Sequence, residues 1–108
     1  MATIDDLQKL DIRIGTFKSV EPIEESEKMY KEIVDFGEEI GEKQILSGIQ
    51  KFFTPDELIG RQALFIINLE PRMIMGIESQ GMLLATDNDL GVVLISPEKI
   101  VPNGSTIH

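Results

Sequence analysis

Short apolar runs separated by turn residues recur along the chain, a pattern typical of a protein built from short β-strands. Strands are expected over residues 12–20, 29–36, 43–48, 61–68, 81–86 and 92–96. The run 61–68 is apolar almost throughout, as in strands that are buried on both faces. Gly15 is expected to introduce a bulge or bend into the first strand, and the glycine-containing segments 37–42 and 101–105 predict turns.

A short helix is expected within residues 1–10. Thr3 can cap it, and Ile4, Leu7 and Leu10 then form one apolar stripe. A helix of this length is not stable alone, so another surface must cover its stripe. The apolar stretch 92–102 near the C-terminus also needs a surface that covers it.

A second helix is expected over residues 54–60, between the third and fourth strands. Thr54 can serve as its N-cap, Pro55 suits the first helical position, and Glu57 completes a capping box. This order of elements is that of a mainly β, five-stranded Greek-key barrel of the oligonucleotide/oligosaccharide-binding (OB) type. A generic α+β sheet remains open on the pattern alone. The expected single domain comprises an N-terminal helix (1–10), the barrel (11–86) and a C-terminal extension (87–108).

Composition excludes several classes of function. The apolar runs are too short to span a bilayer, the N-terminus lacks the layout of a signal peptide, and no cysteine is present. We therefore expect a cytoplasmic protein with no membrane partner. The sole histidine is the last residue, His108, so neither a metal site nor histidine-based catalysis is expected. The sequence predicts a non-enzyme without a cofactor.

Negative charge is concentrated in one segment. The formal net charge is −9, and residues 21–42 hold nine acidic residues against Lys28 and Lys31. This segment thus carries −7 of the total, and the rest of the chain is nearly neutral. On charge alone the protein has the wrong sign for a nucleic-acid binder, whose affinity depends mostly on neutralising phosphates.

A specific motif argues in the other direction. The stretch 44–86, "QILSGIQKFFTPDELIGRQALFIINLEPRMIMGIESQGMLLAT", resembles the tRNA-binding OB domain that occurs as a free dimer and fused to methionyl-tRNA synthetase. The positions that match the family pattern are Ser47, Gly48, Ile49, Thr54, Pro55, Glu57, Leu58, Asn68, Leu69, Pro71, Arg72, Met75, Gly76, Ser79, Gly81 and Met82. The resemblance implies an OB barrel that binds tRNA without catalysing a reaction.

The flanks resemble one branch of this family. "IDDLQKLDIRIGT", "DFGEEIG" and "VVLISPEKIVPNG" are similar to the bacterial CsaA proteins, homodimeric OB proteins described as export-related chaperones. The family's usual His-Pro-x-Ala-Asp-Lys-Leu pattern is replaced here by residues 23–29, "IEESEKM", as it also is in CsaA proteins. The alternative function is therefore a chaperone that binds unfolded or signal-bearing polypeptides.

The resemblance implies a set of RNA-binding residues: Lys28, Lys51, Asn68, Arg72, Ser79 and Met82. Arginine supplies charge and a flat stacking plane, and methionine can pack against an unstacked base. The opposing interpretation is structural: glycines shape the loop, methionines fill the core, and Arg72 is merely solvated. So few cations predict weak, salt-sensitive tRNA binding, with a logarithmic salt slope of about −2 to −4.

The family also implies a two-fold dimer formed by the terminal additions. The expected interface residues are Ile4, Leu7, Leu10, Val93, Ile95 and Val101. An isologous contact would cover the N-terminal stripe and the apolar C-terminal stretch together. We therefore expect a homodimer.

Overall fold

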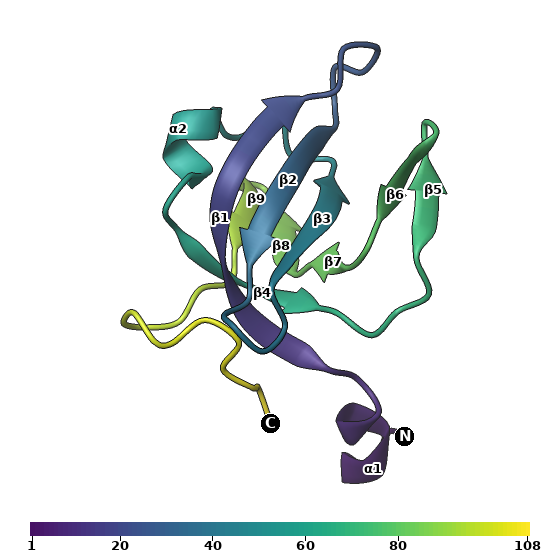
Figure 1. Ribbon diagram of the computed structural model, residues 1–108, viewed down its shortest axis with the longest axis vertical. Helices are drawn as coiled ribbons and strands as arrows, with labels where there is room; N and C mark the ends of the chain where they lie inside the picture. Colours follow the sequence, from purple (N-terminus) through teal and green to yellow (C-terminus); the bar gives the residue numbers. More distant parts are fainter.

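The computed structural model describes all residues, 1–108, and shows a nearly closed antiparallel β-barrel (Figure 1). The strands are β1 (Ile12–Pro22), β2 (Tyr30–Asp35), β3 (Glu42–Ser47), β4 (Gln62–Ile66), β5 (Arg72–Ile74), β6 (Ile77–Ser79), β7 (Met82–Leu83), β8 (Ala85–Asn88) and β9 (Gly91–Leu94). The main sheet has the order β3-β2-β1-β4-β7. The prediction of a mainly β, OB-like barrel is confirmed, and a generic α+β sheet is excluded.

The long strand β1 organises the barrel because it pairs with β2 and β4 on its two edges. Its register shifts between Phe17 and Ser19, which marks the irregularity that lets the strand curve. A bulge or bend was expected at Gly15, but the register shift lies further along the strand, between Phe17 and Ser19. Gly15 is needed for close packing instead, because a Cβ there would lie 2.6 Å from Cγ1 of Val34 and 2.7 Å from Cε1 of Phe36.

The barrel closes between β3 and the segment that precedes β7. The backbone N–H of Gln80 donates to the carbonyl of Gln44 at 2.7 Å, and the N–H of Gln44 donates to the side-chain Oε1 of Gln80 at 2.8 Å. Next to them, the N–H of Leu46 donates to the hydroxyl of Ser79 at 3.1 Å. Side chains thus replace part of a regular β-ladder at this seam.

Aromatic side chains fill the interior. Phe65 meets both Phe17 and Phe36 edge to face, with ring centroids 5.5 and 5.4 Å apart. Helix α2 (Pro55–Leu58) lies between β3 and β4 as predicted, with the expected capping box at Thr54, and it places Leu58 in the core. Because β1 and β4 both contribute to this core, the scaffold beneath the loops is well packed.

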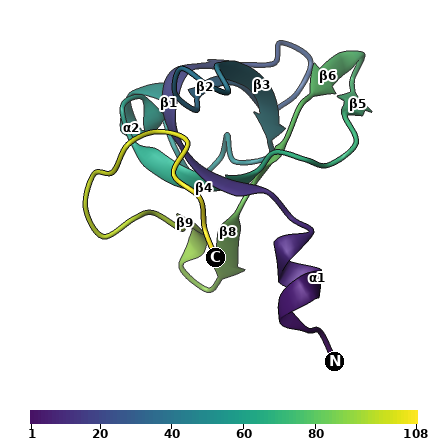
Figure 2. The same ribbon diagram turned by 60° about the horizontal axis from the view of Figure 1, so that its bottom comes forward.

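The two termini lie outside the barrel. Helix α1 (Ile4–Gln8) begins after Thr3 with a capping box, buries none of its residues and projects away from the sheet (Figures 1 and 2). The C-terminal segment runs beside β1, where Gly104 N–H donates to Ile14 O at 2.7 Å and Ile107 N–H donates to Ile12 O at 3.0 Å. No helix of the chain is both long and apolar enough to cross a membrane.

Candidate nucleic-acid interface

A β-hairpin made of β5 and β6 carries the motif between Asn68 and Met82. Its strands pair from Arg72 opposite Ser79 to Ile74 opposite Ile77, and Met75 and Gly76 form the two-residue turn. Both turn residues have positive φ, 54° and 78°, which fits a tight hairpin turn. The hairpin stands beside the barrel (Figure 1). Its residues Arg72, Met73 and Met75 are exposed.

Three of the predicted RNA-binding residues meet at the base of this hairpin. A small hollow of about 60 Å³ is bounded by Leu46, Leu69, Glu70, Arg72, Ile74, Ser79, Gly81 and Met82. We call it the Arg72 hollow. Arg72 takes part in none of the four ion pairs of the chain, so its guanidinium is free to bind an external acceptor. The hollow therefore combines one available cation and one carboxylate, that of Glu70, with an apolar wall.

Ser79 lines the Arg72 hollow but is buried, with 5% of its surface exposed. Its hydroxyl accepts from Leu46 N–H at 3.1 Å and donates to the carbonyl of Gly81 at 3.0 Å. These two bonds give Ser79 a structural role at the barrel seam. Direct contact between Ser79 and RNA stays a prediction.

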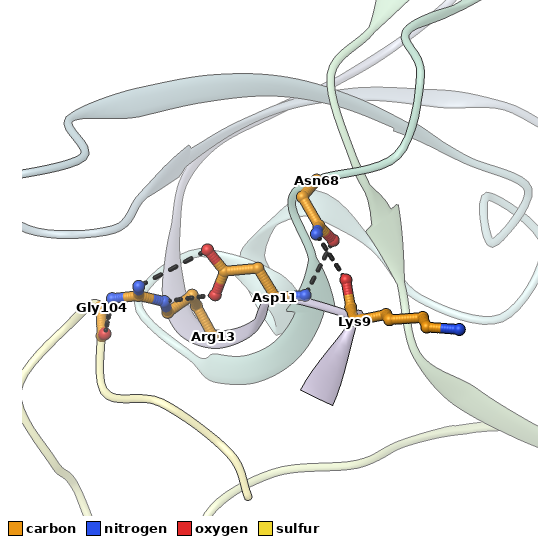
Figure 3. A network of polar contacts seen from close by, with 5 residues as sticks. All are labelled: Lys9, Asp11, Arg13, Asn68 and Gly104. Carbon is orange, nitrogen blue, oxygen red and sulfur yellow. Dashed lines mark hydrogen bonds and ion pairs between the residues drawn. The ribbon is translucent and has the colours of Figure 1, made fainter. Parts of the chain in front are cut away.

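Asn68 lies outside the Arg72 hollow, at the end of the segment that leads into it. Its Oδ1 accepts from Asp11 N–H and its Nδ2 donates to the carbonyl of Lys9, both at 2.8 Å (Figure 3). Both ends of the amide are therefore engaged with the backbone next to α1. The sequence motif identified Asn68 as a special position but gave no sign of this internal contact.

The two predicted lysines belong to a different part of the surface. Lys28 lies in the β1–β2 loop and Lys51 follows β3, and both are exposed. The N–H of Gln50 donates to the carbonyl of Lys28 at 3.0 Å, so the segments that carry the lysines are joined. Neither lysine takes part in an ion pair or lines the Arg72 hollow.

A larger and more acidic cleft of about 340 Å³ lies between the β1–β2 loop and the turn end of the β5–β6 hairpin. It is lined by Glu21, Pro22, Ile23, Glu24, Glu25, Lys31, Met75 and Ile77. Its one cation, Lys31, donates to Glu21 at 2.9 Å, which leaves Glu24 and Glu25 without an ion pair. This acidic cleft repels phosphate and attracts cations.

The residues predicted for a dimer interface are mostly exposed. Ile4 has 64% of its surface exposed, and Leu7, Leu10, Val93 and Ile95 are exposed to a lesser degree. Val101 is half-buried. The stripe of α1 faces a hollow of about 170 Å³ whose opposite wall includes Ile107. The structure thus leaves the α1 stripe without a complete cover within one chain.

Comparisons with known proteins agree on one family. A family model described as "Putative tRNA binding domain" matches residues 12–106. The methionine–tRNA ligase of Archaeoglobus fulgidus is 45% identical over 105 residues, which are 97% of this chain and 16% of the ligase. The chain therefore spans about a sixth of that relative's length.

Solved structures of similar proteins also cover the whole chain. The MetRS-related protein from Pyrococcus horikoshii superposes with a TM-score of 0.91 and 36% identity, covering 100% of this chain and 98% of that one. The CsaA chaperone protein from Picrophilus torridus superposes with a TM-score of 0.92 and 33% identity, covering 100% of both chains. The fold and the terminal additions are therefore similar to those of both proteins.

Proposed function

The chain belongs to the family of tRNA-binding domains, and from this membership we propose that it binds tRNA as a non-catalytic homodimer in the cytoplasm. The relatives named methionine–tRNA ligases support tRNA as the ligand, since the segment they share with this chain is the tRNA-binding domain. In this proposal the barrel recognises the ligand and performs no chemistry.

The observation that carries the proposal is the exposed, unpaired Arg72 at the edge of an apolar hollow. A guanidinium can bind a phosphate in two-pronged fashion or stack on a base, and Leu69 and Met82 offer apolar surface for an unstacked base. Glu70 lines the same hollow and opposes phosphate binding there. Lys28 and Lys51 are exposed cations on a different part of the surface, where they could bind other phosphates of a large ligand such as tRNA.

Arg72→Glu is the direct test. In a mobility-shift titration with bulk tRNA, we expect this variant to bind at least about tenfold more weakly than the native chain, because a phosphate contact becomes a repulsion. The native affinity should fall with salt along a logarithmic slope of about −2 to −4. Lys99→Glu makes the same change of charge on the exposed C-terminal segment and should weaken binding much less. Equal, negligible binding by the native chain and Arg72→Glu would end the proposal.

A second copy of the chain is the proposed cover for the α1 stripe. The helix has no buried residue, and the hollow beside it is walled by apolar side chains of both termini. Two such surfaces related by a two-fold axis are self-complementary. The interface would then include the predicted residues on α1 and, on β9 and beyond, Val93, Ile95 and Val101.

Sedimentation tests the homodimer. At micromolar concentration we expect a mass of about twice the 12.1 kDa of one chain. Leu7→Asp should yield monomers because it places a charge in the apolar contact. Met73→Asp, at an exposed apolar position on the hairpin, is the control and should remain dimeric. A native mass of one chain would refute this part of the proposal.

Polypeptide binding is the second candidate function, and the acidic cleft favours it. The lining of the cleft combines Ile23, Met75 and Ile77 with two glutamates that have no internal ion pair, a chemistry suited to a peptide with both basic and apolar side chains. The similarity to a CsaA chaperone supports the same idea. Exposed methionine adapts its shape to different apolar partners.

The double variant Glu24→Lys/Glu25→Lys tests polypeptide binding. It should weaken binding of a lysine- and leucine-containing peptide at least fivefold, because it reverses the charge of the cleft. Glu38→Lys/Glu39→Lys makes the same change at an exposed turn and should have little effect. If neither variant nor the native chain binds peptide or suppresses aggregation of a denatured protein, polypeptide binding is excluded.

A further inference from the structure

A network of polar contacts fastens both termini to the barrel (Figure 3). The guanidinium of Arg13 donates from Nε to the Asp11 carboxylate at 2.6 Å and from Nη1 to the carbonyl of Gly104 at 2.9 Å. Asn68 adds the two amide contacts to Lys9 and Asp11. We call this set the terminal clamp, because it joins the end of α1, the start of β1 and the C-terminal segment.

Asn68 is the part of the clamp that reaches α1. Its two bonds hold the backbone on either side of Leu10, and the adjacent Ile67 N–H donates to the carbonyl of Asp11 at 2.9 Å. Lys9 is the C-cap residue of α1. The clamp therefore fixes the point and the direction at which the helix leaves the barrel.

Side-chain packing contributes little to the orientation of α1. Helix α1 has five residues, none of them fully buried, so the partial cover of its apolar stripe holds it in place only weakly. An amide is suited to the role because it offers an acceptor and a donor on one rigid plane, whereas a carboxylate offers only acceptors. The orientation of α1 accordingly depends more on a few hydrogen bonds than on buried area.

The same short segment also borders the candidate ligand site. Asn68 is followed directly by Leu69 and Glu70, which line the Arg72 hollow. One amide thus connects the edge of that hollow to the helix whose stripe lacks a cover.

We propose that Asn68 is a positioning residue for assembly: by clamping the backbone at Lys9 and Asp11, it sets the direction of α1 that two copies of the chain require to associate. This inference rests on the proposed homodimer. It assigns Asn68 to assembly rather than to direct contact with RNA. Each copy of the chain contributes its own terminal clamp to the dimer. A substitution of Asn68 therefore weakens two clamps in every dimer.

Asn68→Ala and a matched amide variant test the proposal in the full-length chain. Gln50→Ala is the control, because its side-chain Nε2 also donates to two backbone carbonyls, those of Ser26 and Met29 at 3.3 and 2.8 Å, but holds the β1–β2 loop instead. Sedimentation across a concentration series should show the dimer dissociation constant rising about tenfold or more for Asn68→Ala. Gln50→Ala should leave it unchanged at a similar loss of stability against urea.

Hydrogen exchange of the Asp11 amide gives a second readout that does not depend on global unfolding. We expect faster exchange at Asp11 in Asn68→Ala and native-like exchange in β4. Asn68→Asp keeps the acceptor for Asp11 N–H but turns an acceptor oxygen towards the Lys9 carbonyl in place of the donor, so its dimer should also be weakened. If Asn68→Ala does not fold, the dimer dissociation constant of Asn68→Asp is measured in its place.

The outcomes distinguish this inference from the proposed function. A native dimer whose dissociation constant is the same in Asn68→Ala overturns the role of Asn68 and leaves the homodimer intact. A monomeric native chain overturns both. Equal weakening by Gln50→Ala and Asn68→Ala also contradicts the inference, because it would trace the effect to general destabilisation.

Discussion

A carboxyl group lies inside the barrel at Glu32. On β2 it occupies an inward position between Tyr30 and Val34, and all three residues are buried. Its Oε1 accepts from the Ser47 hydroxyl at 2.9 Å, whereas Oε2 has no hydrogen-bond partner. Burial raises the pKa of Glu32 to about 8, and the bond from Ser47 opposes this rise. The folded protein therefore holds a neutral carboxyl at pH 7.

Glu32 makes stability depend on pH. Between about 4.5, the ordinary pKa, and about 8, the unfolded chain releases the Glu32 proton while the folded chain keeps it. The folded state then binds more protons, so this group's contribution to the free energy of unfolding falls as pH rises, by several kcal/mol in total. Urea unfolding of the native chain and Glu32→Gln should show the variant gaining in relative stability from pH 5 to pH 8. A difference between the two proteins that is the same at both pH values would contradict the buried, neutral state.

Individual side chains show where sequence-based prediction succeeds and fails. Arg72 and Met82 meet at one hollow, as the family motif implied, because the motif specifies a local hairpin and its neighbours. The partner of Asn68 could not be predicted, because Asp11 lies 57 positions away in the sequence. The buried position of Glu32 was likewise not predicted, although its alternation with Tyr30 and Val34 marks it as inward-facing.

At the scale of elements, the barrel seam at Ser79 determines the position of the hairpin. β6 ends at Ser79, and the seam contacts of Ser79 and Gln80 attach it to β3. The Arg72 hollow lies directly beside this seam. The shape of the Arg72 hollow therefore depends on the buried hydrogen bonds of the Ser79 hydroxyl.

Ser79→Ala should destabilise the protein by about 1–3 kcal/mol, because it leaves the buried Leu46 N–H without its acceptor. Urea unfolding monitored by circular dichroism measures this loss. Thr86→Ala, at an exposed strand position, is the control and should change stability by less than about 0.5 kcal/mol. An unfolding free energy for Ser79→Ala equal to that of the native chain would show that the seam does not need the hydroxyl.

Elements with strong local signals were predicted well. The capping box at Thr54 and the apolar run of β4 gave a helix and a strand close to their observed bounds. The β5–β6 hairpin was missed because Met75 occupies a turn position where Asn is usual. The strand expected over 81–86 is divided in the structure, since β7 pairs with β4 whereas β8 pairs with β9.

For the whole molecule, the distribution of charge decides which ligand each surface can accept. The acidic cleft and the Arg72 hollow share the β5–β6 hairpin as a wall. The glutamates of the cleft are therefore close enough to repel a phosphate bound at the hollow. At physiological salt, repulsion between exposed charges is largely screened beyond about 8 Å. Residues 21–42 were identified as acidic from the sequence, but their position beside the hairpin required the fold.

The most direct test of tRNA binding is a titration of the labelled protein with tRNA, followed by backbone amide NMR shifts. The account predicts that the largest shifts lie at Leu69–Met82 and at Leu46, with smaller ones near Lys28 and Lys51, and that added salt reverses them. Shifts confined to the acidic cleft, or none at all at low salt, would contradict the claim that the Arg72 hollow binds tRNA.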